Sequence, residues 1–339
     1  MGKISNMYMP PEWVPHKRTL ISWPVKESMV FPDDYDVVTN GYQELVTAIS
    51  EFEPVTVIVN EADVAKVNEL FSLNNNVEVL SIEHNDAWLR DNGPTFVINE
   101  AGEKAGINWI FNAWGEKYAP WDLDDNVAPK ILKHFNIKQI DAPIVMEGGS
   151  FHVDGEGTLI TTEECLLHPN RNPSLSKTEI EQHLKTYLGV EKIIWLKRGL
   201  SGDETDGHVD NIACYAAPGK VIMQVCEDKH DENYEITQEN ITILENTTDA
   251  KGRRLEVIQI NQPPKVMQQS QRLTLSYLNF YFVNDGIILP VFGGTAEETD
   301  NQAIDVLQQV FPNRKIRTID GMAIIKEGGN VHCTTQQMI

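Results

Sequence analysis

The stretch Glu327-Gly328-Gly329-Asn330-Val331-His332-Cys333 near the C-terminus repeats the frame of an earlier stretch, Glu147-Gly148-Gly149-Ser150-Phe151-His152-Val153. The earlier copy has the apolar Val153 where the later copy has the thiol of Cys333. This difference predicts a duplicated structural unit in which only one copy carries chemistry. Cys333 is therefore a candidate nucleophile, and the rest of the chain must supply its base and its substrate pocket.

A recurring order of elements connects the two copies. A helix leads to a strand, and a loop, a second strand, a Gly-containing turn and a return strand follow. The clearest unit starts with a capping box made by Ser176 and Glu179, and continues through a strand at 193–196. A strand over 208–215 and a return strand over 221–225 complete it. This order predicts an α/β fold built from repeats.

Five such units can be traced along the chain, and the last is incomplete. It lacks a return strand because the chain stops at Ile339, whereas the first unit has a spare strand over 19–23. Pairing of this N-terminal strand beside the strand of Cys333 would close the ring. We therefore expect a closed radial array with a central channel onto which one loop from each unit converges.

The composition is that of a soluble globular protein. The chain has 339 residues, of which 41% are hydrophobic and 23% are charged, so it can bury a sizeable core. We expect no signal peptide and no membrane partner, because no run approaches the ~18 apolar residues of a membrane span. The four cysteines form no Cys-x-x-Cys pair, so a disulfide framework is not expected and a reducing cytoplasm fits best.

The charge of the chain limits its partners. A formal net charge of −22 argues against nucleic acid, because a polyanion would be repelled. The same field would attract a cationic substrate, although acidic surfaces also serve solubility. A homodimer is compatible with the sequence, which does not define the oligomeric state.

The loops of the expected ring present a thiol, a histidine and several carboxylates. These candidates are Asp91, Glu147, Glu204, His208, Asp210 and Cys333. In a strand, the His-x-Asp spacing places His208 and Asp210 on one face, which suits an imidazole that transfers protons beside a carboxylate. His152 and His332 share one position in their repeats, so we interpret them as structural.

Each candidate also has a purely structural alternative. A free cysteine such as Cys333 is often a small buried hydrophobe, and His208 could be an ordinary core or surface histidine. Asp91 could form a local ion pair with Arg90, and Asp210 could only hydrogen-bond backbone. In addition, Glu147 and Glu327 hold equivalent positions, so at least one of them could fasten a loop.

From the sequence we expect neither a cofactor nor a metal ion. Cys165-Leu166-Leu167-His168 is a single Cys-x-x-His pair without a partner at finger spacing, and there is no Walker loop or Gly-x-Gly-x-x-Gly fingerprint. Several carboxylates in one pocket raise each other's pKa unless a cation lies among them. A guanidinium fits this need, since it is always charged and accepts bidentate carboxylates, and its charge would favour the thiolate of Cys333.

Four separated motifs resemble the agmatine deiminases, members of a guanidine-modifying superfamily that includes arginine deiminases and bacterial peptidylarginine deiminases. These motifs are Trp88-Leu89-Arg90-Asp91-x-Gly93-Pro94, Glu147-Gly148-Gly149-Ser150, Asp203-Glu204-Thr205-x-Gly207-His208-Val209-Asp210-Asn211 and Gly328-Gly329-Asn330-x-His332-Cys333-x-Thr335-Gln336-Gln337. The resemblance runs nearly end to end. It implies a single catalytic domain over 1–339, a five-bladed pseudo-symmetric α/β-propeller (the pentein fold) closed by the N-terminal strand.

The resemblance also implies the reaction and the roles of individual residues. Agmatine would be hydrolysed to N-carbamoylputrescine and ammonia, with Cys333 as the nucleophile of a covalent amidino intermediate and His208 as general acid and base. Asp91 and Asp210 would bind the guanidinium. Trp88, Glu147 and Glu204 would belong to the substrate pocket.

Two departures from the family pattern bear on the substrate. Asp206 stands where agmatine deiminases usually have Asn, and residues 116–121 replace a longer Gly-rich loop. The rival within the fold is deimination of free or peptidyl arginine. Free arginine would need a cation for its α-carboxylate, and the motifs show no basic residue beyond Arg90. A non-catalytic propeller that binds a partner is a further alternative, whereas a papain-like protease would need a different cysteine signature.

Overall fold

The computed structural model describes residues 6–29, 32–326 and 328–339. Glu327 lies outside the described residues, so the expectation that Glu147 or Glu327 fastens a loop can be followed only at Glu147. Among the described residues, no helix combines the length and the apolar character that a membrane span requires.

Four three-stranded sheets repeat one pattern of pairing. In each, the first strand is antiparallel to the second, and the second is parallel to the third. They are β4 (Thr95–Ile98), β5 (Lys104–Ile110) and β6 (Lys138–Val145); β7 (Phe151–Val153), β8 (Thr158–Thr162) and β9 (Lys192–Leu196); β10 (Ala213–Ala217), β11 (Lys220–Val225) and β12 (Glu256–Asn261); β15 (Tyr281–Val283), β16 (Gly286–Val291) and β17 (Lys315–Asp320). The repeat of elements predicted from the sequence is confirmed by this pairing.

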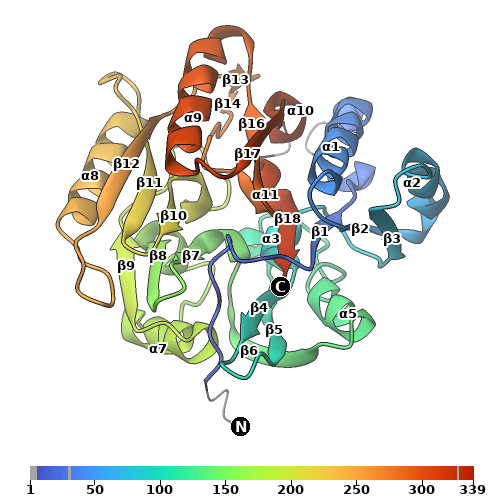
Figure 1. Cartoon of the computed structure of the whole chain (residues 1–339), viewed down its shortest axis with the longest axis horizontal. Helices are drawn as coiled ribbons and strands as arrows, with labels where there is room; N and C mark the ends of the chain where they lie inside the picture. The colour runs from blue at the N-terminus through green and yellow to red at the C-terminus, as the bar shows by residue number, and fades with distance from the viewer. Residues whose placement is uncertain (1–5, 30–31, 327) are drawn as a thin grey trace.

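A fifth sheet joins the two ends of the chain. The C-terminal strand β18 (Thr335–Met338) pairs antiparallel with β1 (Arg18–Ser22), and β1 continues in parallel to β2 (Val55–Val59) and then β3 (Val77–Ser81). The order is β18-β1-β2-β3, so the first three strands repeat the pattern of the other sheets. The predicted pairing of the N-terminal strand beside the strand of Cys333 is confirmed, and Figure 1 shows the two strands side by side.

The longer helices lie outside the sheets in Figure 1. They are α1 (Tyr35–Ser50), α2 (Val64–Leu70), α5 (Val127–His134), α7 (Lys177–Leu188), α8 (Asn233–Glu245) and α9 (Glu297–Val310). The predicted capping box of α7 is present, with Ser176 and Glu179 satisfying each other's backbone, and the left-handed Gly189 (φ 67°) ends the helix. The local signals at both ends of α7 therefore determine its length.

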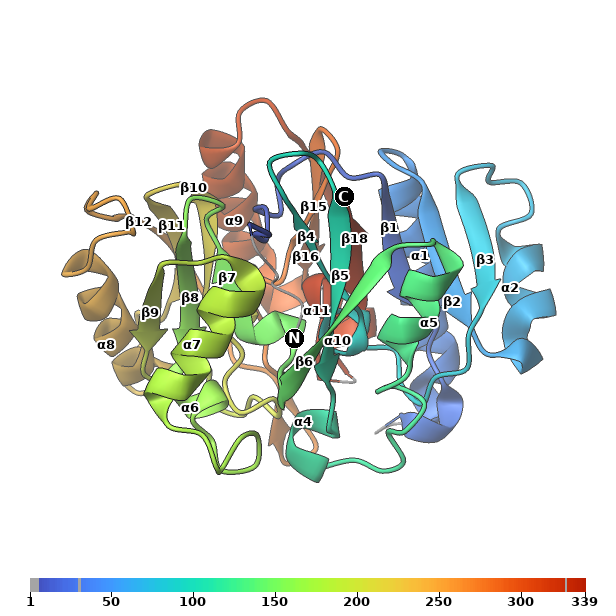
Figure 2. The same cartoon turned by 90° about the horizontal axis from the view of Figure 1, so that it is seen from below.

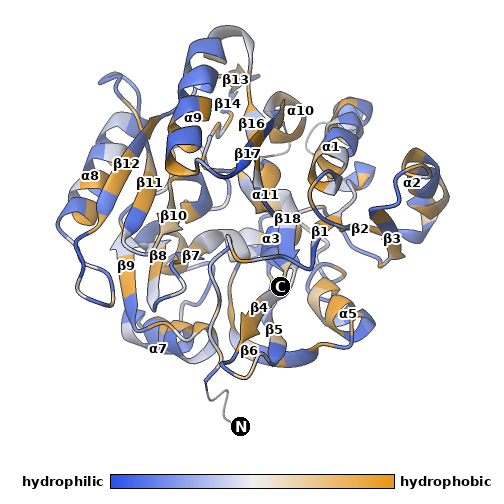
Figure 3. Cartoon of the chain, viewed as in Figure 1, coloured by the Kyte–Doolittle hydropathy of each residue, from blue (hydrophilic) through white to orange (hydrophobic). Residues whose placement is uncertain are grey.

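Apolar side chains are buried between each sheet and its helix. In α7 the buried positions Ile180, Leu184 and Leu188 recur every fourth residue, and they pack in one cluster with Leu159 of β8. Figure 3 shows the same pattern, with orange strands inside and helices that turn a blue face outward. Packing of this kind fixes the sheets and leaves the connecting loops to form the site.

Short helical turns occupy the loops between strands. They are α3 (Leu89–Asn92), α4 (Ala113–Glu116), α6 (Glu163–Leu166), α10 (Gly321–Ile325) and α11 (Val331–Thr334), with 3-10 turns η1 (Lys26–Ser28), η2 (Pro32–Asp34), η3 (Glu61–Asp63), η4 (Gly148–Ser150), η5 (Val209–Asn211) and η6 (Gly294–Ala296). A two-stranded hairpin adds β13 (Met267–Gln268) and β14 (Gln271–Arg272). In Figure 2, α4 and α6 lie toward the same edge of the sheets.

The predicted strand over 208–215 is wrong in its first half. The backbone is left-handed at Gly207 (φ 88°), Val209–Asn211 form the 3-10 turn η5, and the strand begins only at Ala213. His208 and Asp210 are therefore on a turn rather than on one face of a strand. A turn suits this buried polar segment better than a strand. In a strand, successive side chains would point to opposite faces of the sheet.

Candidate active site

One cavity gathers residues from distant parts of the chain. Four residues predicted for the site line it: Trp88, Asp91, Glu204 and Cys333. The other three, Glu147, His208 and Asp210, are fully or almost fully buried next to this lining. The structure thus brings all seven predicted residues into one region.

Cys333 lies in the short helix α11, whose N-cap is Asn330. Its Sγ is 3.1 Å from Asn279 Nδ2, which can donate to the sulfur, and 3.4 Å from Asp210 Oδ2. Burial raises the pKa of the Cys333 thiol well above its ordinary value, and the carboxylates of Asp210 and Asp91 act in the same direction. Without a cation nearby, this cysteine is a neutral thiol.

The double glycines are required by close approach to the site. A Cβ atom on Gly329 would lie 2.5 Å from the Trp88 ring and 2.9 Å from Cys333 Cβ. A Cβ atom on Gly149 would lie 2.6 Å from His208 Nδ1 and 2.9 Å from Asp210 Oδ2. The second glycine of the pair is therefore needed in both copies, because any larger residue there would collide with the candidate groups.

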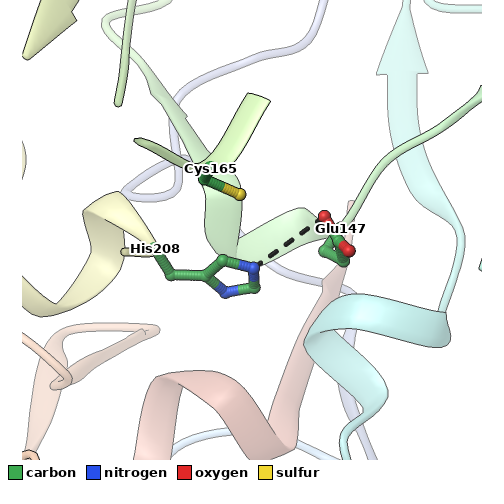
Figure 4. A group of neighbouring side chains, drawn as sticks. All are labelled: Glu147, Cys165 and His208. Carbon is green, nitrogen blue, oxygen red and sulfur yellow. Dashed lines mark ion pairs between the residues drawn. The ribbon is translucent and has the colours of Figure 1, made fainter. Parts of the chain in front are cut away.

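His208 is fully buried between two carboxylates, one of which, that of Glu147, is drawn in Figure 4. Its Nδ1 is 3.8 Å from Asp91 Oδ1 and its Nε2 is 3.9 Å from Glu147 Oε2, distances too long for direct hydrogen bonds. Neither ring nitrogen has a hydrogen-bond partner among the described residues. Burial lowers the pKa of His208, but Asp91, then Cys165 and Glu147, outweigh it and raise the pKa well above 6.5. The imidazole can therefore carry a proton at neutral pH.

The two aspartates have opposite protonation tendencies. Burial raises the pKa of Asp91, whose carboxylate accepts from Gly149 N at 2.9 Å and from Trp114 Nε1 at 2.9 Å. Burial also acts to raise the pKa of Asp210, but His332, through a 2.9 Å hydrogen bond and its charge, outweighs burial and lowers it. Asp210 is thus held as the ionised partner of the pair.

Several structural alternatives can now be assigned. The alternative of a local ion pair between Arg90 and Asp91 is not supported, since Arg90 Nη1 instead contacts Glu12 Oε1 at 3.3 Å and Gln337 Oε1 at 2.9 Å. His332 Nε2 also contacts Glu12, at 2.9 Å. This buried network ties the N-terminal segment to the C-terminal strand beside the site. It agrees with the structural interpretation of His332.

Two basic residues near the site lie outside the four sequence motifs. Arg171 pairs with Glu147 through Nε at 2.6 Å and with Asp206 through Nη1 at 2.6 Å, and Lys117 Nζ pairs with Asp206 at 2.6 Å. Burial acts to raise the pKa of Glu147, but the charge of Arg171 outweighs it and lowers the value. The motifs contain no basic residue beyond Arg90, but the fold adds Arg171 and Lys117 from outside the motifs, and both are already paired with carboxylates. No local motif marked either residue.

One group of side chains has the composition of a metal site. Among the described residues, the potential ligand atoms of Glu147, Cys165 and His208 lie within 4.8 Å of one another. Cys165 therefore faces His208 and not the His168 that follows it in sequence, a juxtaposition that spacing alone did not reveal. Arg171 already binds Glu147, and this positive charge acts against a cation there. The expectation of a site without metal stays a prediction.

Asp124 supports the loop of Asp86, a residue that lines the cavity. Asp124 Oδ1 accepts from the backbone N–H groups of Asn85 at 2.7 Å and Asp86 at 3.1 Å. Burial raises the pKa of Asp124 to about 7. The charge of Asp86 also acts to raise this pKa, whereas the hydrogen bonds from the two backbone N–H groups act to lower it. The folded protein therefore holds this carboxyl group protonated at pH values where an unfolded chain ionises it.

This shift predicts a specific pH dependence of stability. Between the ordinary value of 3.8 and about 7, the unfolded state has lost this proton and the folded state has kept it, so stability falls as pH rises through this window. Asp124→Asn keeps the accepting oxygen and removes the ionisation. We expect it to raise the free energy of unfolding at pH 8 by on the order of 3 kcal/mol, with no gain at pH 4. Urea unfolding at the two pH values measures this; an equal effect at both would contradict it.

The geometry defines what the cavity can do chemically. A thiol, an imidazole that can carry a proton and two buried aspartates surround one space, and the nearest guanidinium and ammonium groups of the protein are paired with carboxylates. A small planar cation would supply the missing positive charge and would lower the pKa of the thiol. The site suits nucleophilic attack on such a cation, followed by proton transfer through His208.

Comparisons with known proteins cover almost the whole chain. Residues 8–338 match the family described as Porphyromonas-type peptidyl-arginine deiminase. A curated protein of Legionella pneumophila is 48% identical over 98% of this chain and 94% of its own length. The agmatine deiminase of Ectopseudomonas mendocina is 42% identical, over 99% of this chain and 96% of that protein. The solved agmatine deiminase of Enterococcus faecalis superposes with a TM-score of 0.93 at 38% identity, covering 98% of this chain and 96% of that one.

Proposed function

This chain belongs to the Porphyromonas-type peptidyl-arginine deiminase family, and from this premise we propose that it hydrolyses agmatine to N-carbamoylputrescine and ammonia. The observation that carries the proposal is the cavity, which combines Cys333 with Asp91 and Glu204 and borders His208. The nearly full-length relatives named agmatine deiminases support the choice of substrate. The substrate is a small guanidine with a second positive charge, in keeping with the net charge of −22.

In the proposed mechanism the guanidinium lies between Asp91 and Asp210, and its charge lowers the pKa of the Cys333 thiol, which releases its proton to solvent. The thiolate, with Asn279 donating to its sulfur, attacks the central carbon and forms a C–S bond. His208 protonates one NH₂ group as the C–N bond breaks and ammonia leaves, so a covalent amidino-thioether remains. His208 then takes a proton from water, which attacks the same carbon, and the C–S bond breaks to release the ureido product.

The other pocket residues position the substrate in this proposal. Trp88 covers the Gly329 turn beside the nucleophile, and Glu147 adds to the effect of Asp91 in raising the pKa of His208. Glu204 lines the cavity away from the His208 and Glu147 pair and would receive the far amine of agmatine. The family resemblance implies only that these three residues belong to the pocket, so their individual roles are part of the proposal.

We also propose that the five sheets are the blades of a pseudo-symmetric α/β-propeller within one catalytic domain over 1–339. The repeated antiparallel-then-parallel pairing supports it, as does the use of β1 beside β18. We also propose a cytoplasmic location. The four cysteines support it, because all of them are free, as is usual in a reducing compartment. The oligomeric state stays undefined, with a homodimer compatible.

Deimination of arginine, free or in a peptide, is the rival on the same fold. Free arginine carries an α-carboxylate that would need a cation at the outer end of the cavity. Lys117 and Arg171 lie near that end, but Asp206 pairs with both of them. The pairing favours a substrate without a carboxylate, so agmatine fits better than arginine. A non-catalytic binding module has no use for a thiol, an imidazole and two buried aspartates in one place.

Ammonia release from agmatine, free arginine and a blocked peptidyl arginine, compared side by side, tests this function. We expect the highest kcat/KM with agmatine. A preference for either arginine form would overturn the substrate while leaving the chemistry intact. No release from any of the three would overturn the proposed reaction itself.

A further inference from the structure

Glu204 is held by two side chains from different segments of the chain. The hydroxyl of Tyr118, in the shortened loop after α4, donates to Glu204 Oε2. The amide of Gln271, in β14 of the hairpin, donates to Glu204 Oε1. Each carboxylate oxygen therefore has a donor of its own, which restricts rotation of the group.

Both donors are neutral, which is informative about the ligand. A carboxylate paired with a lysine or an arginine has already met its counter-ion, whereas Glu204 keeps its full negative charge toward the cavity. Its Oε2 lies 3.8 Å from where a Cβ atom of Gly328 would be, so it faces the turn that leads to Cys333. The carboxylate is thus oriented but not neutralised by these two donors.

A lysine next to Glu204 donates to oxygens other than those of the Glu204 carboxylate. Lys117 Nζ donates to the backbone oxygen of Glu204 at 2.5 Å and to Asp206 Oδ1 at 2.6 Å. Asp206 also accepts from Arg171, at 2.6 Å, and from Asn170, at 3.0 Å. The departure to Asp at position 206 therefore offsets the positive charge that the shortened loop introduces next to Glu204.

From these contacts we infer that Tyr118 and Gln271 are positioning residues that fix Glu204 as the receptor for the far ammonium of the substrate. They make the cavity selective for guanidines that carry a second cation. This inference rests on the proposed deimination and adds the residues that set its specificity. Tyr118 and Gln271 act through Glu204, and neither takes part in the transfer of protons or in bond formation.

The test compares two guanidines of equal chain length: agmatine, and n-butylguanidine, which lacks the amine. Tyr118→Phe removes one hydroxyl and Gln271→Ala removes the second donor, while Gln268→Ala on the paired strand β13 controls for disturbance of the hairpin. We expect Tyr118→Phe and Gln271→Ala each to raise the KM for agmatine about tenfold with little change in kcat. The same variants should leave the KM for n-butylguanidine within about twofold of the parent value.

The outcomes separate this inference from the proposed function. An equal rise in KM for both guanidines, or no rise for agmatine, would overturn the role of Tyr118 and Gln271. If the unmodified protein turned over neither guanidine, the proposed function would fail. The inference would still be tested by calorimetric binding of the two guanidines in a Cys333→Ala background. There, a loss of affinity confined to agmatine would support it, and unchanged or equally reduced affinities would overturn it.

Discussion

Replacing Cys333 with alanine should lower the rate of agmatine hydrolysis by roughly 10⁴-fold or more, while agmatine still binds. The substitution removes the sulfur atom that is proposed to form the covalent bond. Asp91, Asp210 and Glu204, which are proposed to bind the two ends of the substrate, stay in place. Ammonia release and calorimetric titration of the same preparation measure the two quantities. The expected result is a large loss of kcat with a measurable dissociation constant.

The matched control for this substitution is Cys226→Ala. Cys226 is a buried free thiol with its Sγ 3.6 Å from the backbone oxygen of Asp228, and it lines a separate surface hollow. We expect this variant to retain turnover close to that of the parent. Substantial activity in Cys333→Ala would remove Cys333 as the nucleophile. Loss of agmatine binding in a folded Cys333→Ala variant would contradict the division between binding and bond formation.

Deletion of residues 335–339 should prevent stable folding even though the nucleophile remains in the chain. The deletion removes β18, the antiparallel partner of β1, together with Met338 and Ile339 from the buried cluster that contains Leu20. Loss of each large buried side chain costs about 2–5 kcal/mol, and the strand pairing is lost as well. The sum is comparable with the 5–15 kcal/mol that stabilises an ordinary domain.

Thermal unfolding followed by circular dichroism, with gel filtration of the same sample, checks this deletion. We expect no cooperative transition and a large share of aggregate. Met338→Leu is the matched control, since it keeps β18 and the buried volume and should cost less than about 1.5 kcal/mol. A deletion variant that melts cooperatively near the temperature of the parent would show that the joining of the chain ends contributes little to stability.

The repeat pattern could be predicted because it depends on local signals and on counting. The capping box at Ser176 and Glu179, the Gly189 stop and the surplus N-terminal strand are all visible in the sequence. The strand at 208–215 was partly wrong, because the left-handed Gly207 and the burial of a polar segment favour a turn. The alternation of polar and apolar residues over this segment does not distinguish a turn from a strand.

The sequence predicts the site residues that belong to recognisable motifs, but not those that other loops bring to the site. The seven proposed residues come together, since each belongs to a motif that loops present to one region. Residues 116–121 were expected to bear on the substrate, but the contacts of Lys117, Tyr118 and Arg171 could not be predicted, because they depend on which loops meet in space. In the sequence, Cys165 forms a Cys-x-x-His pair with His168, whereas the fold places Cys165 beside His208.

The central claim of this account is a covalent bond between Cys333 and the carbon of the guanidinium. Rapid acid quenching during turnover of agmatine, followed by peptide mass spectrometry, measures it most directly. We expect the peptide with Cys333 to gain the mass of agmatine minus ammonia, and the modification to disappear as the substrate is used up. Rapid turnover with Cys333 unmodified at every time, or with the mass on Cys165 instead, would contradict the claim.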